Sequence, residues 1–500
     1  MKTGRRRFLG LGVTATLGAA LAACGAPAGS APTAAPKPAE KPAAPAATKP
    51  SEKPTEPSAP APTTAPAKPA ADAKPTADAK PTAAAPSGQK SVTIKAIHRI
   101  AYGAEQDKQV FPVGYEDFKK KTGITVEETL VPEDQQMPVK ILTMVAGNTA
   151  PDVAYIHPQW LASMAGKGAL QPLDAYMKEP AVKATDLWPG ALRYFQFPHG
   201  DKTYGIPFYS GPSVYIYNKT LLKQASLPSP DELERDGKWT WEAMRELAQK
   251  ATKGSGPEKI FGHDTFSSGL HWQNVLIWAF GGDLWDKELK KTLLGEPKAV
   301  EAIQFLGDVH HKDKSVPEAA DLQGITGGKS GRIISGRVVL QYGIKGNVPE
   351  IADWAQQRNV EIGMAPMPKG PNGRFVRNGP NSYCVMKASK LQDEGFQLIN
   401  YMSQDDFQAL QYKVGASIPP RKTQMDSEAF KKSLRPWESL VMLKEAAEAD
   451  VALPMAATHI DVQNTYTPAW DEIRLGRKPA KDALAAIVPK INELLAKAQS

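Results

Sequence analysis

The chain has few cysteines: Cys24 and Cys384 are the only two among 500 residues. If Cys24 is modified, as the residues around it indicate below, no disulfide can form in the mature chain. A protein of this length must then be held together by its hydrophobic core. Cys384 lies in the stretch Ser382-Tyr383-Cys384-Val385-Met386, which is typical of a buried strand, so we expect an inert thiol there.

Large hydrophobic residues are absent from residues 25–90, which contain no Ile, Leu, Val, Met or aromatic residue. Sixteen of the chain's 44 prolines fall there, among Ala, Thr, Ser and Lys. Such a segment cannot bury enough apolar surface to offset its ordering entropy. We therefore expect residues 25–90 to be a disordered, partly polyproline-like tether, and we read its short repeats as low complexity.

Residues 91–500 carry almost no net charge. The formal net charge is +8, but residues 1–90 hold twelve Lys or Arg and five Asp or Glu, which is a net charge of +7. Only about +1 is left for residues 91–500. Nothing in that region therefore indicates a nucleic-acid partner.

The common motifs of catalytic and metal sites are also missing from residues 91–500. The histidines never take the His-x-x-x-His spacing of a helical zinc site, so we expect no metal and no cofactor. A phosphate-loop pattern ending at Lys329-Ser330 fails because its first position holds Gln323 instead of glycine. The Gly-x-Ser-x-Gly turn of many hydrolases does not occur.

The amino terminus carries a recognisable export signal. Arg5-Arg6-Arg7 precede a short apolar stretch, and small residues lead to a cysteine in Leu21-Ala22-Ala23-Cys24. The apolar stretch is shorter than the roughly 20 residues that span a membrane. The segment resembles a bacterial lipoprotein signal with a lipobox, so we expect residues 1–24 to be the signal and Cys24 the lipidated residue. Acyl chains there would anchor the protein outside the cytoplasm, on the outer face of a membrane.

The route of export stays open. Arg5-Arg6-Arg7-Phe8-Leu9 resembles the twin-arginine motif, although Gly4 stands where Ser or Thr is usual. Twin-arginine export of the folded chain and general secretion of the unfolded chain are both compatible with these residues. A structural thiol at Cys24 is the alternative to lipidation.

Strands and helices alternate along residues 91–500, which indicates an α/β fold. The first predicted elements are strands at 92–96, 125–130 and 152–155, and helices at 115–120 and 138–146. A strand is predicted at 213–217, a helix entered at Thr240, and later helices at 297–310, 391–403, 405–414 and 480–498. The length suits two lobes. Ligands bind beyond the carboxyl ends of strands, so we expect a ligand after Ile97 and after Ile156.

A series of short motifs in a fixed order resembles the family 1 extracellular solute-binding proteins, which include maltose-binding proteins. The motifs begin with FKKKTGIT from Phe118, AGNTAPDV from Ala146, GALQPLD from Gly168, YGIP from Tyr204, YNK from Tyr217 and WTWE from Trp239. FGGDL from Phe280 and GASIPPR from Gly415 continue the order. The resemblance covers essentially all of residues 91–500.

The resemblance implies a two-lobed, type II periplasmic-binding-protein-like fold with a hinge and a ligand cleft between the lobes. The lobes would comprise 91–207 plus about 370–414, and 208–369 plus about 415–500. The chain would cross first near 208–212 and return near 370–381. The function implied is capture of a solute, most often a sugar or oligosaccharide, by closure of the cleft and delivery to the permease of an ABC importer. We expect a monomer without enzymatic activity.

A sugar site needs aromatic rings for the apolar faces of the sugar, and amides, carboxylates or hydroxyls for its hydroxyl groups. Such residues stand where the fold places the cleft. The candidate ligand-binding residues are Tyr102, Gln106, Gln159, Trp160, Tyr209, Trp272, Gln273, Tyr342, Asn381 and Tyr466. Each can instead cover the surface or fill the core. We expect a core position for the other candidate tryptophans: Trp239, Trp241, Trp278, Trp354 and Trp437.

Two other functions remain as alternatives. A surface-anchored carbohydrate-active enzyme would need a pair of carboxylates, for which Asp283 and Asp286 are candidates. Their position after Gly281-Gly282 matches a turn of the family, which favours a structural role. An adhesive or scaffold lipoprotein would explain the tether but not the ordered motifs.

Overall fold

The computed structural model describes residues 92–99, 104–131, 137–197, 200–264, 269–322, 332–415 and 417–498. The predicted signal with Cys24, the predicted tether and Tyr102 lie outside these ranges. Gln106 is described only as part of a helical backbone. Within the described ranges, no helix is long and apolar enough to cross a membrane.

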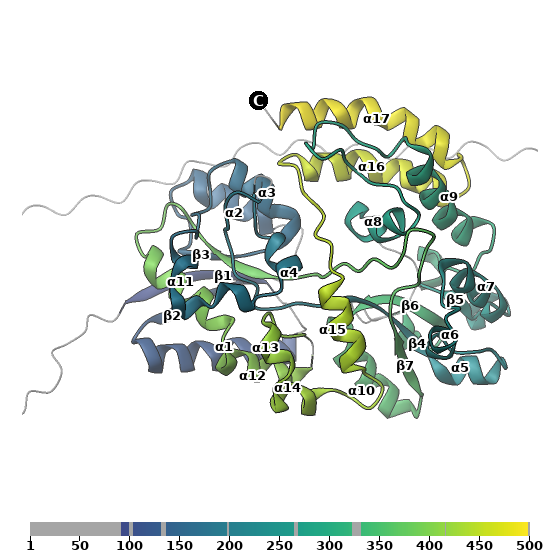
Figure 1. Cartoon of the computed structure of the whole chain (residues 1–500), viewed down its shortest axis with the longest axis horizontal. Coiled ribbons are helices and arrows are strands. Elements are labelled where there is room, and N and C mark those ends of the chain that lie inside the picture. The colour runs from purple at the N-terminus through teal and green to yellow at the C-terminus, as the bar shows by residue number, and fades with distance from the viewer. Residues whose placement is uncertain are drawn as a thin grey trace, which may run out of the picture. The chain divides into compact units, whose positions relative to one another are not determined.

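A four-stranded sheet of order β2-β1-β3-β8 forms the centre of the part that we call lobe 1 (Figure 1). Its strands are β1 (Thr93–Arg99), β2 (Thr125–Val131), β3 (Val153–Ile156) and β8 (Ser382–Val385). β1 pairs in parallel with β2 and β3, and β8 is antiparallel to β3. Every residue of β3 and β8 is buried, as in strands that are covered on both faces.

The helices of lobe 1 are α1 (Ala104–Thr122), α2 (Met137–Ala146), α3 (Pro158–Gly166), α11 (Gln392–Met402) and α12 (Asp405–Val414). Their apolar residues and those of the sheet form one core cluster. Cys384 is fully buried in it, and burial raises the pKa of its thiol, as expected for an inert cysteine.

A second four-stranded sheet, of order β5-β6-β4-β7, forms the centre of lobe 2. Its strands are β4 (Ser213–Asn218), β5 (Phe261–His263), β6 (Val338–Ile344) and β7 (Ile362–Ala365). β4 is antiparallel to both β6 and β7, and β5 is parallel to β6. Both sheets are therefore mixed.

Two core clusters hold the helices of lobe 2. The helices that precede β7 in the chain are α5 (Lys219–Gln224), α6 (Pro230–Arg235), α7 (Trp241–Ala251), α8 (Leu270–Ala279), α9 (Pro297–His311) and α10 (Val348–Arg358). The helices that follow α12 in the chain are α13 (Lys422–Met425), α14 (Glu428–Ser433), α15 (Leu440–Glu448), α16 (His459–Arg474) and α17 (Ala480–Lys497). The short helix α4 (Pro189–Arg193) adds Ala191 to one of these clusters, although in the chain it lies between α3 and the first crossing from lobe 1.

Several predicted elements match the structure. Thr240 caps α7: its hydroxyl oxygen accepts the backbone N–H of Ala243 at 3.1 Å. The tryptophans assigned to the core are buried, except Trp437, which is half-buried against the core. Two predicted boundaries were wrong. β1 extends to Arg99, because it pairs with β2 along its whole length, and α1 begins at Ala104 despite Pro112 in its interior.

Three segments of chain lie side by side where the two lobes join. Tyr209 forms an antiparallel bridge with Asn381, and Pro212 forms one with Asn378. Ile418 donates its backbone N–H to the carbonyl of Ser210 at 2.8 Å, which adds a third segment. We call residues 208–212 and 377–381 the first and second crossings. They occupy the places predicted for the hinge, while the exact lobe boundaries stay a prediction.

Candidate functional site

A row of aromatic rings runs from lobe 1 to lobe 2. It starts at Trp160 in α3, whose ring centroid lies 5.7 Å from that of His157. The His157 ring lies 6.5 Å from the ring of His271 in α8, which is 5.4 Å from Trp272. The row ends at Tyr342 on β6, 5.5 Å from Trp272 and perpendicular to it. We refer to these five residues as the aromatic row.

Polar contacts accompany the row where it passes between the lobes. The side-chain amide nitrogen of Gln159 in α3 makes a short contact with Nε2 of His271 in α8. His157 caps the amino end of α3, with Nδ1 3.4 Å from the backbone nitrogen of Gln159. The first turns of α3 and α8 therefore face each other, and a solute held here would contact both lobes.

Arg377, in the second crossing, lies beside the row. Its guanidinium carbon is 4.3 Å from the centroid of the Trp272 ring, an arrangement typical of a cation–π contact. Only 1% of Arg377 is exposed, and none of its three guanidinium nitrogens has a hydrogen-bond partner in the described part of the chain. A buried cation without an acceptor is rare in folded proteins, so this position is a candidate for ligand contact.

Two residues of the second sheet contact Trp272 and Arg377: Tyr342 packs against Trp272, and Ser213 bonds to Arg377. Their hydroxyl oxygens are 2.8 Å apart, and the Ser213 hydroxyl donates to the carbonyl of Arg377 at 2.7 Å. Burial raises the pKa of Tyr342 to about 12, although the charge of Arg377 acts in the opposite direction. The Tyr342 hydroxyl is therefore neutral and can both donate and accept hydrogen bonds.

A second buried arginine lies on the lobe 1 side. Arg99, at the end of β1, donates to the hydroxyl of Tyr155 at 2.7 Å, and its guanidinium carbon is 4.8 Å from that ring. Burial raises the pKa of Tyr209 above its usual range, and the charges of Arg99 and Arg377 both oppose this shift. Tyr209 in the first crossing thus lies within the electrostatic reach of two guanidinium groups.

Asp450 is a buried carboxylate on which the charge of Arg377 acts. One of its oxygens accepts the backbone N–H of Asn378 at 2.8 Å and the hydroxyl of Tyr194 at 3.4 Å. Burial raises the pKa of Asp450 to about 6, and the charge of Arg377 limits the rise. No ion pair joins Asp450 to Arg377 in the described ranges, so the two charges act on each other only over a distance. Tyr194 also lines an adjoining hollow of about 40 Å³ that has residues of both lobes, such as Pro158 and Leu289, in its wall.

The structure brings only some of the predicted site residues together. Trp272, Tyr342, Trp160 and Gln159 belong to the row or touch it. Trp160 is 5% exposed within the lobe 1 core, which favours the core interpretation over a stacking platform in this conformation. Tyr209 and Asn381 are buried partners at the crossings: Asn381 donates its backbone N–H to the Tyr209 carbonyl at 3.1 Å.

Gln273 and Tyr466 lie in the interior of lobe 2. Both are completely buried, and the Tyr466 hydroxyl donates to the side-chain oxygen of Gln273. Their mutual bond fits a core pair that joins α8 to α16. Tyr102 lies outside the described residues, and nothing is described of the Gln106 side chain. Which of the ten residues contact a solute remains a prediction.

The sequence patterns did not single out His157, Arg377 or Asp450. A signal existed for Arg377, because a charged residue within a predicted crossing is expected to be buried. For Asp450 no local signal existed, because its partner Asn378 is distant in sequence.

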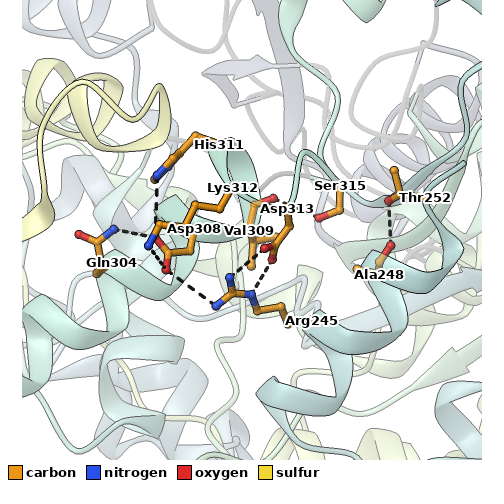
Figure 2. A network of polar contacts seen from close by, with 10 residues as sticks. All are labelled: Arg245, Ala248, Thr252, Gln304, Asp308, Val309, His311, Lys312, Asp313 and Ser315. Atoms are coloured by element: carbon orange, nitrogen blue, oxygen red, sulfur yellow. Dashed lines mark hydrogen bonds and ion pairs between the residues drawn. The ribbon is translucent and has the colours of Figure 1, made fainter. Parts of the chain in front are cut away.

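A separate polar network lies on lobe 2, between α7 and the end of α9 (Figure 2). Arg245 donates to both oxygens of Asp313 at 2.5 and 2.8 Å, and Asp308 accepts from Gln304 and Lys312 at 2.8 and 2.9 Å. An open hollow of about 440 Å³ adjoins it. Because these central charges are already paired with one another, we assign the network to helix packing.

The candidate catalytic carboxylates are engaged in local structure. Asp283 accepts the indole N–H of Trp278 at 3.0 Å and the backbone N–H of Leu284 at 2.7 Å. Asp286 accepts the backbone N–H groups of Lys290 and Lys291 at 2.7 and 3.1 Å. These bonds fix turns, in agreement with the structural role favoured above.

Comparison with known proteins gives the family. The family model described as bacterial extracellular solute-binding protein matches residues 102–409. The chain belongs to this family. A solved ABC substrate-binding protein from Listeria monocytogenes in complex with cycloalternan is similar with a TM-score of 0.71 at 18% identity, covering 81% of this chain and 100% of that one. The fold predicted from the ordered motifs is thereby confirmed.

Other relatives agree with this family. The maltose-bound MalE3 of T. maritima has a TM-score of 0.66 at 21% identity, covering 81% of this chain and 100% of that one. A probable ABC transporter-binding protein of Deinococcus radiodurans is 25% identical over 64% of this chain and 74% of its own length. An uncharacterized lipoprotein of Streptomyces antibioticus is 32% identical over 23% of this chain, and the match spans only 24% of that relative.

Proposed function

We propose that this member of the family is an extracytoplasmic lipoprotein that captures a sugar or oligosaccharide between its lobes and delivers it to an ABC permease. The observation that carries the proposal is the aromatic row, which passes from α3 of lobe 1 to α8 and β6 of lobe 2. Aromatic faces beside buried amides and hydroxyls suit the alternating apolar and polar surface of a sugar. The maltose bound to the similar MalE3 supports this solute class.

Solute capture would work through the crossings. They are the segments that join the lobes, and rotation about them would separate His157 and Gln159 from His271. A solute that contacts both sides favours the closed arrangement by its greater affinity for that form. The permease would then recognise the closed arrangement. No step of this cycle requires a catalytic acid or base.

The first test is the role of Trp272. If a solute packs against the row, Trp272→Ala should weaken its binding by on the order of 1 to 3 kcal/mol, since the ring supplies apolar contact. The solute is first found by thermal unfolding of the full-length chain against mono- and oligosaccharides, polyols, amino acids and polyamines. A ligand at about a hundred times its Kd should stabilise the protein by about 2.7 kcal/mol.

Trp437→Ala is the matched control for that test, because Trp437 is also half-buried but packs in another part of lobe 2. We expect it to lower the melting temperature without changing the affinity measured by calorimetric titration. Equal loss of affinity in both variants would contradict a solute site at the row. Conversion of the solute during the titration would favour the enzyme alternative.

Membrane attachment is tested at Cys24. Cys24→Ala should move the protein from the membrane fraction to the soluble fraction, because the acyl anchor is lost, while solute affinity stays unchanged. Cys384→Ala is the control, since that buried thiol can carry no anchor, and it should stay membrane-bound. Membrane retention of the Cys24→Ala protein would refute the lipobox assignment.

A further inference from the structure

Arg377 is a buried cation whose guanidinium makes no hydrogen bond within the described part of the chain. The residue is 1% exposed, and its Nε and both Nη atoms lack partners among the residues described. Its backbone, by contrast, is fixed: the Arg377 carbonyl accepts the N–H and the hydroxyl of Ser213 at 2.8 and 2.7 Å. The chain therefore holds the guanidinium in a set place without using its N–H groups.

The immediate surroundings leave this cation without a bonded counter-charge. One face of the guanidinium packs on Trp272 at 4.3 Å, and a Cβ at Gly379 would stand 3.3 Å from one Nη atom. Glycine at 379 thus lets the backbone of the second crossing approach the guanidinium closely. A ring face offsets part of the loss of hydration but accepts no bidentate hydrogen bonds.

Asp450 does not neutralise the cluster by pairing. One of its oxygens is bonded to the Asn378 N–H and the Tyr194 hydroxyl, and no ion pair with Arg377 occurs between described residues. Arg99 adds a second positive charge that acts on Tyr209 from the lobe 1 side, as Arg377 does from the second crossing. Two guanidinium groups therefore act on Tyr209. Asp450 acts on Arg377 by its charge, but it bonds through only one oxygen, and its other oxygen has no hydrogen-bond partner among the described residues.

We propose that the solute carries an anionic group, a carboxylate or a phosphate ester, on a hydroxylated body, and that Arg377 binds this group. The inference rests on the proposed function, because it names the class of solute that the same cleft takes. A guanidinium fork matches two oxygens of a carboxylate or phosphate, whereas a neutral hydroxyl offers no charge. Trp272 and Tyr342 would contact the uncharged body.

Matched pairs of neutral and anionic solutes test whether a negative charge on the solute strengthens its binding. The full-length chain is titrated calorimetrically with neutral mono- and disaccharides, with the corresponding uronates, and with the corresponding sugar phosphates. We expect an anionic member to bind at least about tenfold more tightly than its neutral counterpart, with the affinity weakened by salt. The uronate and phosphate arms distinguish the two anions. Neutral members that bind as tightly as anionic ones would overturn the inference and leave the proposed function intact. Binding of no member would contradict both.

Variants of Arg377 test whether this residue causes the preference for anionic solutes. Arg377→Met should reduce the preference for the anionic member to less than about twofold, and Arg377→Lys should keep part of it, since the charge remains but the fork is lost. Arg374→Met is the control, because Arg374 is paired with Glu234, and should keep the full preference. The melting temperature shows whether Arg377 has a structural role instead. Because Arg377 makes no internal hydrogen bond that could be lost, the Arg377→Met protein should have an unchanged melting temperature. A full preference in Arg377→Met, or a large fall in its melting temperature, would overturn the assignment.

Discussion

Replacing Lys345 with methionine should lower the free energy of unfolding by about 3 to 5 kcal/mol, the largest single-site loss that we expect. The Lys345 and Glu438 side chains form an ion pair with no exposed surface. Lys345 also donates to the carbonyl of Gly415 at 3.1 Å, in the segment between α12 and Ile418, which pairs with the first crossing. Without the ammonium, Glu438 would stay buried and lose its buried partner, and it would keep only the partly exposed Arg435, whose guanidinium lies 3.6 Å away and whose backbone N–H it accepts at 2.9 Å.

An exposed pair provides the control for this prediction. Lys223 and Glu361 are 2.6 Å apart, but both side chains are 58% exposed. Lys223→Met should therefore cost less than about 1 kcal/mol. Chemical denaturation of both variants measures the difference, and the double variant Lys345→Met/Glu438→Gln should recover part of the loss because no charge stays buried. Similar losses for Lys345→Met and Lys223→Met would show that burial of the Lys345–Glu438 pair does not increase its contribution to the free energy of unfolding.

Acidification should destabilise the protein through three buried histidines. Burial lowers the pKa of His98 and His263 to about 3 and that of His459 to about 4. In the unfolded chain the pKa of histidine is about 6.5, so the unfolded state binds more protons between these values. The stabilising effect is complete above about pH 6.5 and is lost as the pH falls toward the folded values.

The size of the acid effect follows from the same shifts. At about pH 5 each histidine should cost roughly 2 kcal/mol relative to about pH 7.5. Asp450 opposes this loss by about 1 kcal/mol, because burial raises its pKa to about 6 and stability is gained as the pH falls through that value. The net loss should be roughly 5 kcal/mol, measured by denaturant titrations at both pH values.

Single histidine variants test the cause of the acid effect. His459→Leu should reduce the loss between the two pH values by roughly 2 kcal/mol, since a leucine cannot be protonated. A loss that is the same in His459→Leu and in the parent would show that other groups govern acid unfolding.

Local patterns predicted the parts of this fold that depend on neighbours in sequence. Thr240 was recognisable as a helix start because a cap bonds within its own turn, and the apolar spacing of the last helix matches α17. The ends of elements were less predictable. β1 continues to Arg99 because β2 pairs with it, which is a tertiary effect.

The candidate site could be predicted only in part because it is assembled from distant segments. Trp272 and Tyr342 were recognisable as aromatic residues near predicted element ends, and they meet in the structure. Arg377 meets Trp272 only because the second crossing passes α8, and the sequence around either residue contains no trace of that contact. Trp160 was predicted to bind a ligand because of its position after β3, with a core position as the alternative. Its ring is buried in the lobe 1 core, because α3 packs there.

Hydrogen–deuterium exchange of the full-length chain, with and without the solute found by screening, tests most directly whether the solute binds between the lobes. The proposal predicts slower exchange in the bound state at three places: the start of α3 (residues 157–160), the start of α8 (269–273) and the crossings (208–212 and 377–381). Slower exchange confined to one lobe, or centred on the Arg245 network of Figure 2, would contradict capture between the lobes.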